Sequence, residues 1–313
     1  MAQGKRPTKR GRSKKRKNKR KDETRIVLLF LILLLIVLII AVALFYTKHR
    51  MRSVDSPQVK LPEVTPETYL KKPLKREEEK TQDILKRKGE YHRTYQVAII
   101  IDDLGYNIDQ AEKILQIDAP LTISIFPLGT YSKFIAEKAH SLGKEVMLHL
   151  PMEPYRYPEK NPGNGGLLLS MSNEELLEKL DENIESVPFI KGVNNHMGSR
   201  FTEDREKMRI VLMELKRRNL FFVDSRTTNN SAGYSLAKDM GLNVAGRNIF
   251  LDNVEDVELI SVQLNKLANV SFRNGSAVGI GHPHPTTIEA LTQMIPKLKA
   301  QGIEVVPISQ LVD

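Results

Sequence analysis

The stretch that most constrains this sequence is Val97–Gly105, in which five apolar residues run directly into Asp102 and Asp103. A continuous apolar run of this length, rich in β-branched residues, is typical of a strand buried in a parallel sheet. Ligands of α/β folds bind at the carboxyl ends of such strands. Because adjacent like charges need a positive neighbour, the pair predicts a divalent metal, with one aspartate as ligand and the other as base. A helix N-cap followed by a first-turn acid is the alternative for this stretch alone.

Composition narrows the classes of protein that this chain can belong to. The 313 residues include no cysteine, which excludes disulfides, a thiolate nucleophile and cysteine-type zinc sites. The formal net charge is +10, but residues 1–25 hold about a dozen Lys and Arg against Asp22 and Glu23. The basic balance therefore describes a tail, and it does not indicate a nucleic-acid-binding domain.

The basic tail is followed by an uninterrupted apolar run over residues 26–46. About 21 apolar residues are enough to span a bilayer as a helix. Since the positive charges are concentrated before the run, we expect a single-pass protein of the bacterial cytoplasmic (inner) membrane, with residues 1–25 as a cytoplasmic tail and the C-terminal part outside. A cleaved signal peptide ending near Ala41-Val42-Ala43 is the alternative, although the run exceeds a typical signal-peptide core.

Residues 47–94 are rich in Pro, Lys and Glu and predict a linker. From residue 95 to 313 the pattern changes to strands alternating with helices. The expected strands cover residues 97–101, 121–126, 145–148, 190–193, 221–223, 243–245, 277–280 and 304–306. The expected helices cover residues 132–142, 203–218, 232–240 and 257–272, with two more opened by capping boxes at Ser172–Glu175 and Thr286–Glu289. This alternation predicts a parallel (β/α) barrel of seven or eight strands, regular or distorted.

The acidic residues and histidines of interest share one position, directly after a predicted strand. They are Asp102, Asp103, His149, His196, Asp224, His282 and His284. Each of them alone has an ordinary structural explanation, but in a barrel all would meet at one face. One Asp with two His suits zinc or a similar divalent ion with open positions for water. Such an ion activates water and polarises carbonyl groups, so the set predicts metal-assisted hydrolysis of an amide or ester.

These residues resemble the motifs of polysaccharide deacetylases, the NodB-like carbohydrate esterases. Ile99-Ile100-Ile101-Asp102-Asp103 resembles the first motif, and Gly143–His149 resembles the second, which ends in a metal-binding His. Phe222–Ser225 resembles a reduced fourth motif, and Gly279-Ile280-Gly281-His282 resembles the fifth, whose His is the general acid.

Two positions depart from the common pattern of that family. Glu153 stands where a second metal His is usual, and Asn194–Ser199 lacks the Arg of the third motif. These departures, together with Gly281-His282-Pro283-His284-Pro285, are similar to the divergent polysaccharide deacetylase family. The resemblance covers roughly residues 95–312.

The resemblance implies a role for each candidate residue. Asp103, His149 and His196 are the expected metal ligands, with Glu153 as a fourth ligand or a substitute. Asp102 is the expected base and His282 the expected acid, with His284 as the alternative acid or a substrate contact. Asp224 is expected to orient a histidine or a water, and Asn195 and Arg200 to contact the substrate.

Location and resemblance together give the expected substrate and cofactor. An outward-facing domain would meet envelope polysaccharide such as peptidoglycan, with zinc as the expected divalent metal. The expected function is removal of acetyl groups from, or amide cleavage in, such a glycan. The alternative is a catalytically inactive module that keeps the fold and binds glycan or envelope partners.

Overall fold

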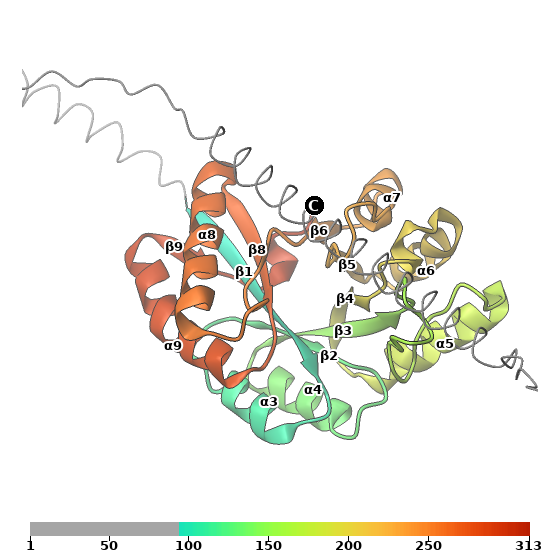
Figure 1. Cartoon of the computed structure of the whole chain (residues 1–313), viewed down its shortest axis with the longest axis horizontal. Coiled ribbons are helices and arrows are strands. Elements are labelled where there is room, and N and C mark those ends of the chain that lie inside the picture. Colours follow the sequence, from blue (N-terminus) through green and yellow to red (C-terminus); the bar gives the residue numbers. More distant parts are fainter. Residues whose placement is uncertain (1–93) are drawn as a thin grey trace, which may run out of the picture. The chain divides into compact units, whose positions relative to one another are not determined.

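The computed structural model describes residues 94–313 (Figure 1). The predicted cytoplasmic tail, transmembrane helix and all but the end of the linker lie outside these residues. Within the described part of the chain, no helix combines the length and the apolar character that crossing a membrane requires.

Within residues 94–313, nine strands form one sheet, and every pair of neighbouring strands in it is parallel. The strands are β1 (Tyr95–Leu104), β2 (Thr122–Ile125), β3 (Glu145–Met152), β4 (Ile190–Met197), β5 (Phe221–Asp224), β6 (Val244–Gly246), β7 (Ile249–Phe250), β8 (Ser276–Gly281) and β9 (Ile303–Val305). The helices are α3 (Ile108–Leu115), α4 (Ser132–Ser141), α5 (Asn173–Ser186), α6 (Arg205–Arg217), α7 (Gly233–Asp239), α8 (Val257–Asn274) and α9 (Pro285–Ala300).

The strand order β6-β5-β4-β3-β2-β1-β8-β7, with β9 beside β1, describes a curled parallel sheet whose two ends do not pair. Residues 247–248 span the gap, because Arg247 N donates to Asp224 O (3.0 Å) and Asn248 N donates to Val278 O (2.9 Å). The α/β class and the parallel strands are therefore confirmed, whereas a regular closed barrel is not formed. No pattern in the sequence indicates β7, a strand of only two residues.

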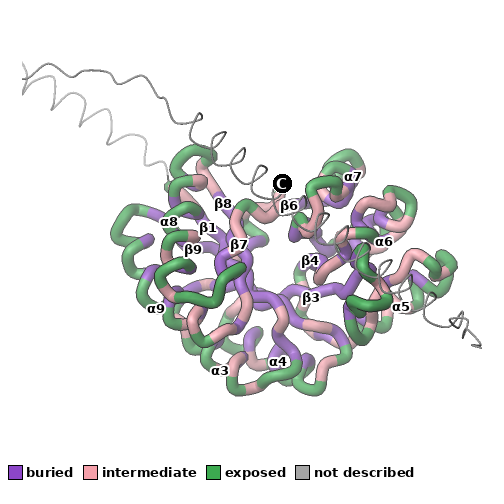
Figure 2. Tube along the Cα trace, in the orientation of Figure 1, coloured by how far each residue is buried: buried purple, intermediate pink, exposed green. Residues whose placement is uncertain are grey.

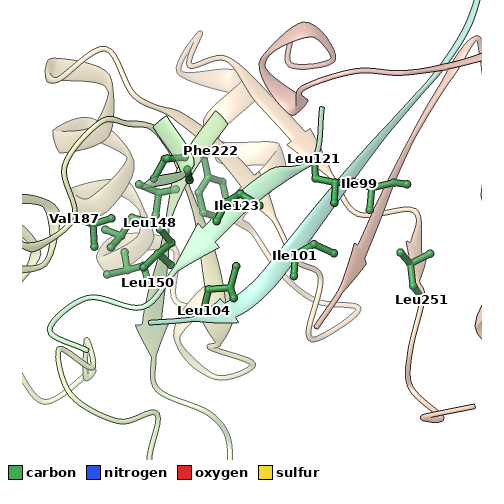
Figure 3. Packing of buried hydrophobic residues seen from close by; sticks show 14 of the residues in the cluster. Ile99, Ile101, Leu104, Leu121, Ile123, Leu148, Leu150, Val187, Phe222 and Leu251 are labelled. Atoms are coloured by element: carbon green, nitrogen blue, oxygen red, sulfur yellow. The ribbon is translucent and has the colours of Figure 1, made fainter. Parts of the chain in front are cut away.

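Alternation along the strands divides the core into two parts. Residues such as Ile99, Ile101, Ile123 and Leu148 face outward and pack under the helices, where they are fully buried (Figure 3). The exposed faces of the helices lie outside this layer, and the buried strands lie at the centre (Figure 2). A second, smaller cluster fills the inside of the curl and includes Ala98, Ile100, Met147, Val223, Val278, Ile280 and Ile308.

The caps of two helices test the expected starts. Ser172 Oγ accepts from Glu175 N, and Glu175 Oε2 accepts from Ser172 N, so the capping box of α5 is confirmed. The expected box at Thr286 is wrong, because the N-cap of α9 is His284, two residues earlier, and Pro285 lies in the first turn. The Thr286 hydroxyl is buried and unpartnered.

Candidate metal centre

The inner face of the curled sheet changes from apolar to polar toward the carboxyl ends of the strands. Alternate residues of a strand face the same side, and Ile100, Met147, Val223 and Ile280 belong to the inner cluster. Two residues further along the chain come, respectively, Asp102, His149, Ser225 and His282, the last two just past the ends of β5 and β8. The period of two therefore places four polar side chains over an apolar floor at one end of the sheet.

Asp103 joins this group through a β-bulge. By alternation it would face outward with Ile99 and Ile101, but the register of β1 against β2 shifts between Ile101 and Leu104. Asp103 has a left-handed backbone with φ of 60°, a conformation that Asp tolerates better than most residues. The bulge turns Asp103 back to the inner side, so both adjacent carboxylates reach the same pocket.

Three ligating atoms from β1, β3 and β4 converge in this pocket. Asp103 Oδ1 lies 3.0 Å from His149 Nε2 and 3.2 Å from His196 Nδ1, and the two nitrogens are 3.0 Å apart. Ligands of zinc lie about 2.0–2.2 Å from the ion, so neighbouring ligand atoms around it are roughly 3 Å apart. Asp103 Oδ1 is buried and has no hydrogen-bond partner within residues 94–313. The donor set, its spacing and this unpartnered oxygen fit a divalent cation.

Asn194 on β4 determines which nitrogen of His149 is free. Its Nδ2 donates to Asp102 Oδ1 (2.8 Å) and Oδ2 (3.1 Å), and since a carboxylate only accepts, the amide oxygen must face the other way. That oxygen lies 3.0 Å from His149 Nδ1 and also accepts from Ser124 Oγ at 2.7 Å. His149 therefore carries its proton on Nδ1 and presents the Nε2 lone pair to the pocket, as a metal-ligating histidine requires.

Charge and burial shift the pKa values of the three groups in the metal-free protein. Burial opposes the ionisation of Asp103, but the adjacent His149 and His196 rings outweigh it and hold the pKa of Asp103 well below its usual range. Burial likewise opposes protonation of His149, but the carboxylates of Asp102 and Asp103 raise its pKa. Burial dominates at His196 and lowers its pKa. A cation at this position would compete with a proton for His149 Nε2.

His282 stands on the opposite side of Asp103, with Nε2 3.9 Å from Asp103 Oδ2. Its Nδ1 donates to Asp252 Oδ1 at 2.9 Å, and Asp252 also accepts from Thr287 Oγ1 at 2.8 Å. Burial opposes protonation of His282, but the Asp252 carboxylate outweighs burial and raises the pKa of His282 to about 9. Burial likewise opposes ionisation of Asp252, but His282 outweighs it and the pKa of Asp252 is lowered. His282 is therefore protonated at neutral pH, as an acid must be.

Phe126 gives the centre an apolar wall. Its ring contacts His149 and His196 edge-on, at centroid distances of 5.0 Å and 4.7 Å. The ring of Tyr106, which is exposed, also packs against Phe126, at a centroid distance of 5.7 Å. An apolar neighbour fixes both imidazole rings and limits the access of water to their nitrogens.

The structure does not bring every predicted site residue to this centre. Glu153 Oε1 accepts from Arg200 Nη1 at 2.7 Å and its Oε2 from Leu169 N at 2.8 Å, so Glu153 and Arg200 pair with each other. Asp224 accepts from Arg226 N, Ser231 Oγ and Tyr234 N and contacts none of the histidines. Neither carboxylate lies where a ligand or a histidine-orienting group is needed.

Of the two other predicted substrate contacts, Asn195 is buried between strand ends and His284 lies at the rim of the pocket. Asn195 is buried, and its amide joins Met197 O (2.8 Å) to Ser225 N (2.9 Å), so it braces the strand ends. His284 lies beside His282 at a ring distance of 5.8 Å, with its Nδ1 3.5 Å from Glu255 Oε2. His284, unlike Asn195, remains at the rim of the pocket.

Sequence reasoning did not assign a role to Asp252, whose carboxylate orients His282. In Phe250-Leu251-Asp252, as in the first strand, apolar residues are followed directly by an aspartate. However, β7 has only two residues, too few for the sequence to predict a strand there. Asp252, His282 and His284 also form a group with closely spaced ligating atoms. Both oxygens of Asp252 already accept hydrogen bonds there, which leaves the Asp103 group as the better cation site.

Comparison with known proteins gives the same assignment as the motifs. The chain is 37% identical over 201 residues to the uncharacterized protein YibQ of Escherichia coli (strain K12), covering 64% of this chain and 62% of that relative. It is 33% identical over 195 residues to a protein of Haemophilus influenzae, covering 62% of this chain and 69% of the relative. The crystal structure of an uncharacterized protein from Agrobacterium tumefaciens C58 is similar with a TM-score of 0.68 and 26% identity, over 70% of this chain and 90% of that one.

The family comparison covers most of the chain. The chain spans about 62% of the length of the Escherichia coli relative. A family model described as divergent polysaccharide deacetylase matches residues 99–312, which include every residue of the centre described above. This chain belongs to the divergent polysaccharide deacetylase family.

Proposed function

We propose that this chain is a metal-dependent hydrolase that removes acetyl groups from, or cleaves amide bonds in, an envelope glycan. The observation that carries the proposal is the convergence of Asp103 Oδ1, His149 Nε2 and His196 Nδ1, with the carboxylate oxygen left without a hydrogen bond. A divalent cation such as zinc held there would supply a Lewis acid that polarises an acyl carbonyl and lowers the pKa of water.

Two further residues have the chemistry that such a hydrolysis needs. Asp102 is the remaining carboxylate of the pocket and is the proposed base that takes the proton of the attacking water. His282, protonated through Asp252, is the proposed acid that gives a proton to the leaving nitrogen. The water thus adds its oxygen to the acyl carbon, the carbon–nitrogen bond breaks, and acetate and a free amine result.

A binding module without turnover is the second candidate, and one observation favours it. Asp102 is only 2% exposed, and both its oxygens accept from Asn194. Its Oδ1 lies 3.6 Å from His149 Nδ1, on the side of the ring away from Asp103. A carboxylate in that position is also suited to orienting a ligand histidine, without any part in proton transfer.

The first test is the metal content of the full chain purified without added metal or chelator. We expect stoichiometric zinc or another transition metal, lost in His149→Ala and in His196→Ala. His140→Ala is the matched control, because His140 stacks on Phe189 at 4.0 Å, outside the pocket, and should keep the metal. Absence of metal, with none taken up on titration, would rule out the hydrolase mechanism.

The second test separates the two candidate functions. Asp102→Asn should retain the metal but lose acetate release from N-acetylated glycans, including peptidoglycan, if the chain is an enzyme. A wild-type protein that holds the metal, binds the glycan and releases no acetate supports the binding module.

We further propose that residues 26–46 anchor the protein in the cytoplasmic membrane with residues 95–313 outside. The uncharged apolar run and the basic tail before it support this topology. The test is membrane fractionation followed by protease treatment of spheroplasts, which should digest the C-terminal domain and spare the tail. Release of the domain into a soluble fraction would support a cleaved signal peptide.

A further inference from the structure

Two arginines lie at the rim of the pocket, just after the ends of the neighbouring strands β5 and β6. Arg247 follows the last residue of β6, and alternation from Ala245, a member of the inner cluster, turns it to the same side as the metal centre. Arg226 comes two residues after the end of β5, with a left-handed backbone of φ 49°. Both side chains therefore start from the same edge of the sheet as His149 and His282.

Each guanidinium is held in place by the other residue's backbone and by an aromatic ring. Arg247 donates through Nε to Ser225 O (2.7 Å) and through Nη2 to Arg226 O (2.9 Å), and Arg226 Nη1 lies 3.4 Å from Arg247 O. Arg247 lies over the ring of Phe250 at 3.9 Å and Arg226 over that of Tyr234 at 5.4 Å. The two positive charges are thus fixed side by side before any ligand is bound.

Gly246, at the end of β6, leaves space for the guanidinium of Arg226. A Cβ atom at Gly246 would meet Arg226 Nη2 at 2.7 Å and Cζ at 2.8 Å. Only a residue without a side chain lets the guanidinium of Arg226 lie against the end of β6. The sequence Gly246-Arg247 is therefore suited to bringing two arginines together.

Within residues 94–313, no carboxylate lies within ion-pair distance of either guanidinium. Asp224 is near, but its oxygens accept from the backbone of Arg226 and Tyr234 and from Ser231. Burial and the charge of Arg226 lower the pKa of Arg247, against the opposing effect of Asp224 and Asp102. Two like charges that the surrounding protein does not neutralise favour an anion from outside.

The pair is connected to the metal centre on two sides. The Phe250 ring under Arg247 stacks on His282 at a centroid distance of 6.0 Å and an angle of 14°. Ser225, whose carbonyl holds Arg247, accepts through its hydroxyl from Asn194 at 3.3 Å. A saccharide seated at the metal centre would therefore reach the arginines with a neighbouring group or sugar unit.

We propose that Arg226 and Arg247 bind a carboxylate carried by the glycan that enters the metal centre, so that the preferred substrate is an acidic, N-acetylated saccharide. This inference rests on the proposed function, because it takes the occupant of the pocket to be a glycan. A guanidinium pair matches the geometry of a carboxylate and adds specificity as well as affinity.

The test compares one saccharide with and without its charge. Calorimetry on the zinc-loaded full chain, at low salt, measures binding of a hyaluronan tetrasaccharide and of its methyl ester, which differ only in the carboxylate. We expect the acid to bind about tenfold more tightly than the ester, as charged hydrogen bonds to one group imply. Arg226→Gln and Arg247→Gln should each remove most of this preference, and Arg247→Lys should restore part of it.

Two controls separate the position of the charge from its presence. Gly246→Ala keeps both arginines but displaces Arg226, so it should also weaken binding of the acid and leave that of the ester unchanged. Arg209→Gln removes one positive charge from an exposed position of α6 and should change neither affinity. Thermal melting and zinc content of every variant verify that the fold and the centre are intact.

Equal affinity for acid and ester, or a preference that survives both glutamine variants, would overturn the inference and leave the hydrolase proposal standing. Failure of both saccharides to bind would also overturn it. The hydrolase proposal is judged separately, by metal content and by acetate release from neutral N-acetylated glycans. The two proposals can therefore fail independently.

Discussion

Replacing Asp252 with Asn removes the charge that keeps His282 protonated. The pKa of His282 is raised from its ordinary value of 6.5 to about 9, an interval that corresponds to roughly 3 kcal/mol at about 1.36 kcal/mol for each pKa unit. Asp102 and Asp103 share in that effect at longer range, since the nearest oxygen of Asp103 is 3.9 Å from His282. We therefore assign about 2 kcal/mol of the stabilisation to Asp252 itself.

The sign of the pH dependence follows from the direction of this pKa shift. A group whose pKa is raised on folding contributes stability that is fully present below its unfolded pKa and is lost as the pH rises through its folded pKa. The stability difference between wild type and Asp252→Asn should therefore be largest near pH 6 and shrink by about 2 kcal/mol toward pH 10. A pH-independent part should remain, because Asp252 also accepts from Thr287 and from the backbone of His282.

The assay is urea unfolding of the metal-free chain in chelator at several pH values between 6 and 10, with NMR titration of the His282 ring. Asp256→Asn is the matched control, because Asp256 caps α8 through Leu259 N and faces no histidine, so its effect should not vary over this range. A difference for Asp252→Asn that stays constant from pH 6 to 10 would refute the reasoning. So would a His282 titration that is the same in the variant and in wild type.

Three further substitutions test other parts of the structure. Asn194→Leu leaves Asp102 without its donor and His149 without its orienting acceptor, so zinc affinity measured by competition with a chelating dye should fall about 10–100-fold; unchanged affinity would contradict the tautomer assigned to His149. Glu153→Gln should leave the zinc content unchanged and lower the free energy of unfolding by about 1–2 kcal/mol through the lost charge facing Arg200, whereas loss of zinc would restore Glu153 as a ligand. Gly192→Ala places a Cβ 2.1 Å from the Phe221 ring, and urea unfolding should show a loss of about 1–3 kcal/mol, because the inner cluster has no room to expand; a neutral result would mean that the ring can move.

The sequence predicted most of the sheet because its strands are short apolar runs with polar ends. The runs around Val97, Ile123, Val146 and Val278 each correspond to an observed strand. Closure of the barrel could not be predicted, since it depends on how β6 and β7 meet across residues 247–248 and not on the pattern of either strand. A strand as short as β7 carries too few residues to show a period at all.

For the candidate site, the rule that polar residues follow strands brought together Asp102, Asp103, His149, His196 and His282. The same rule gave Glu153 and Asp224 site roles that their contacts do not support, because their carboxylate oxygens accept hydrogen bonds from neighbouring loop residues instead. Position after a strand shows which end of the sheet a residue occupies. It does not show whether its polar atoms are already used by neighbouring backbone groups.

A sequence pattern did not predict the β-bulge that lets Asp102 and Asp103 face the same pocket. In a regular strand, adjacent side chains face opposite sides, so two neighbouring carboxylates should not share a pocket. Here three residues of β1, from Ile101 to Leu104, advance against two of β2, from Ile123 to Ile125, and the extra residue is accommodated at Asp103. The bulge gives one carboxylate to His149 and His196 and leaves the other to Asn194. Because one residue of backbone separates these two environments, a substitution that straightened β1 would remove Asp103 from the centre while leaving every ligand residue in the sequence.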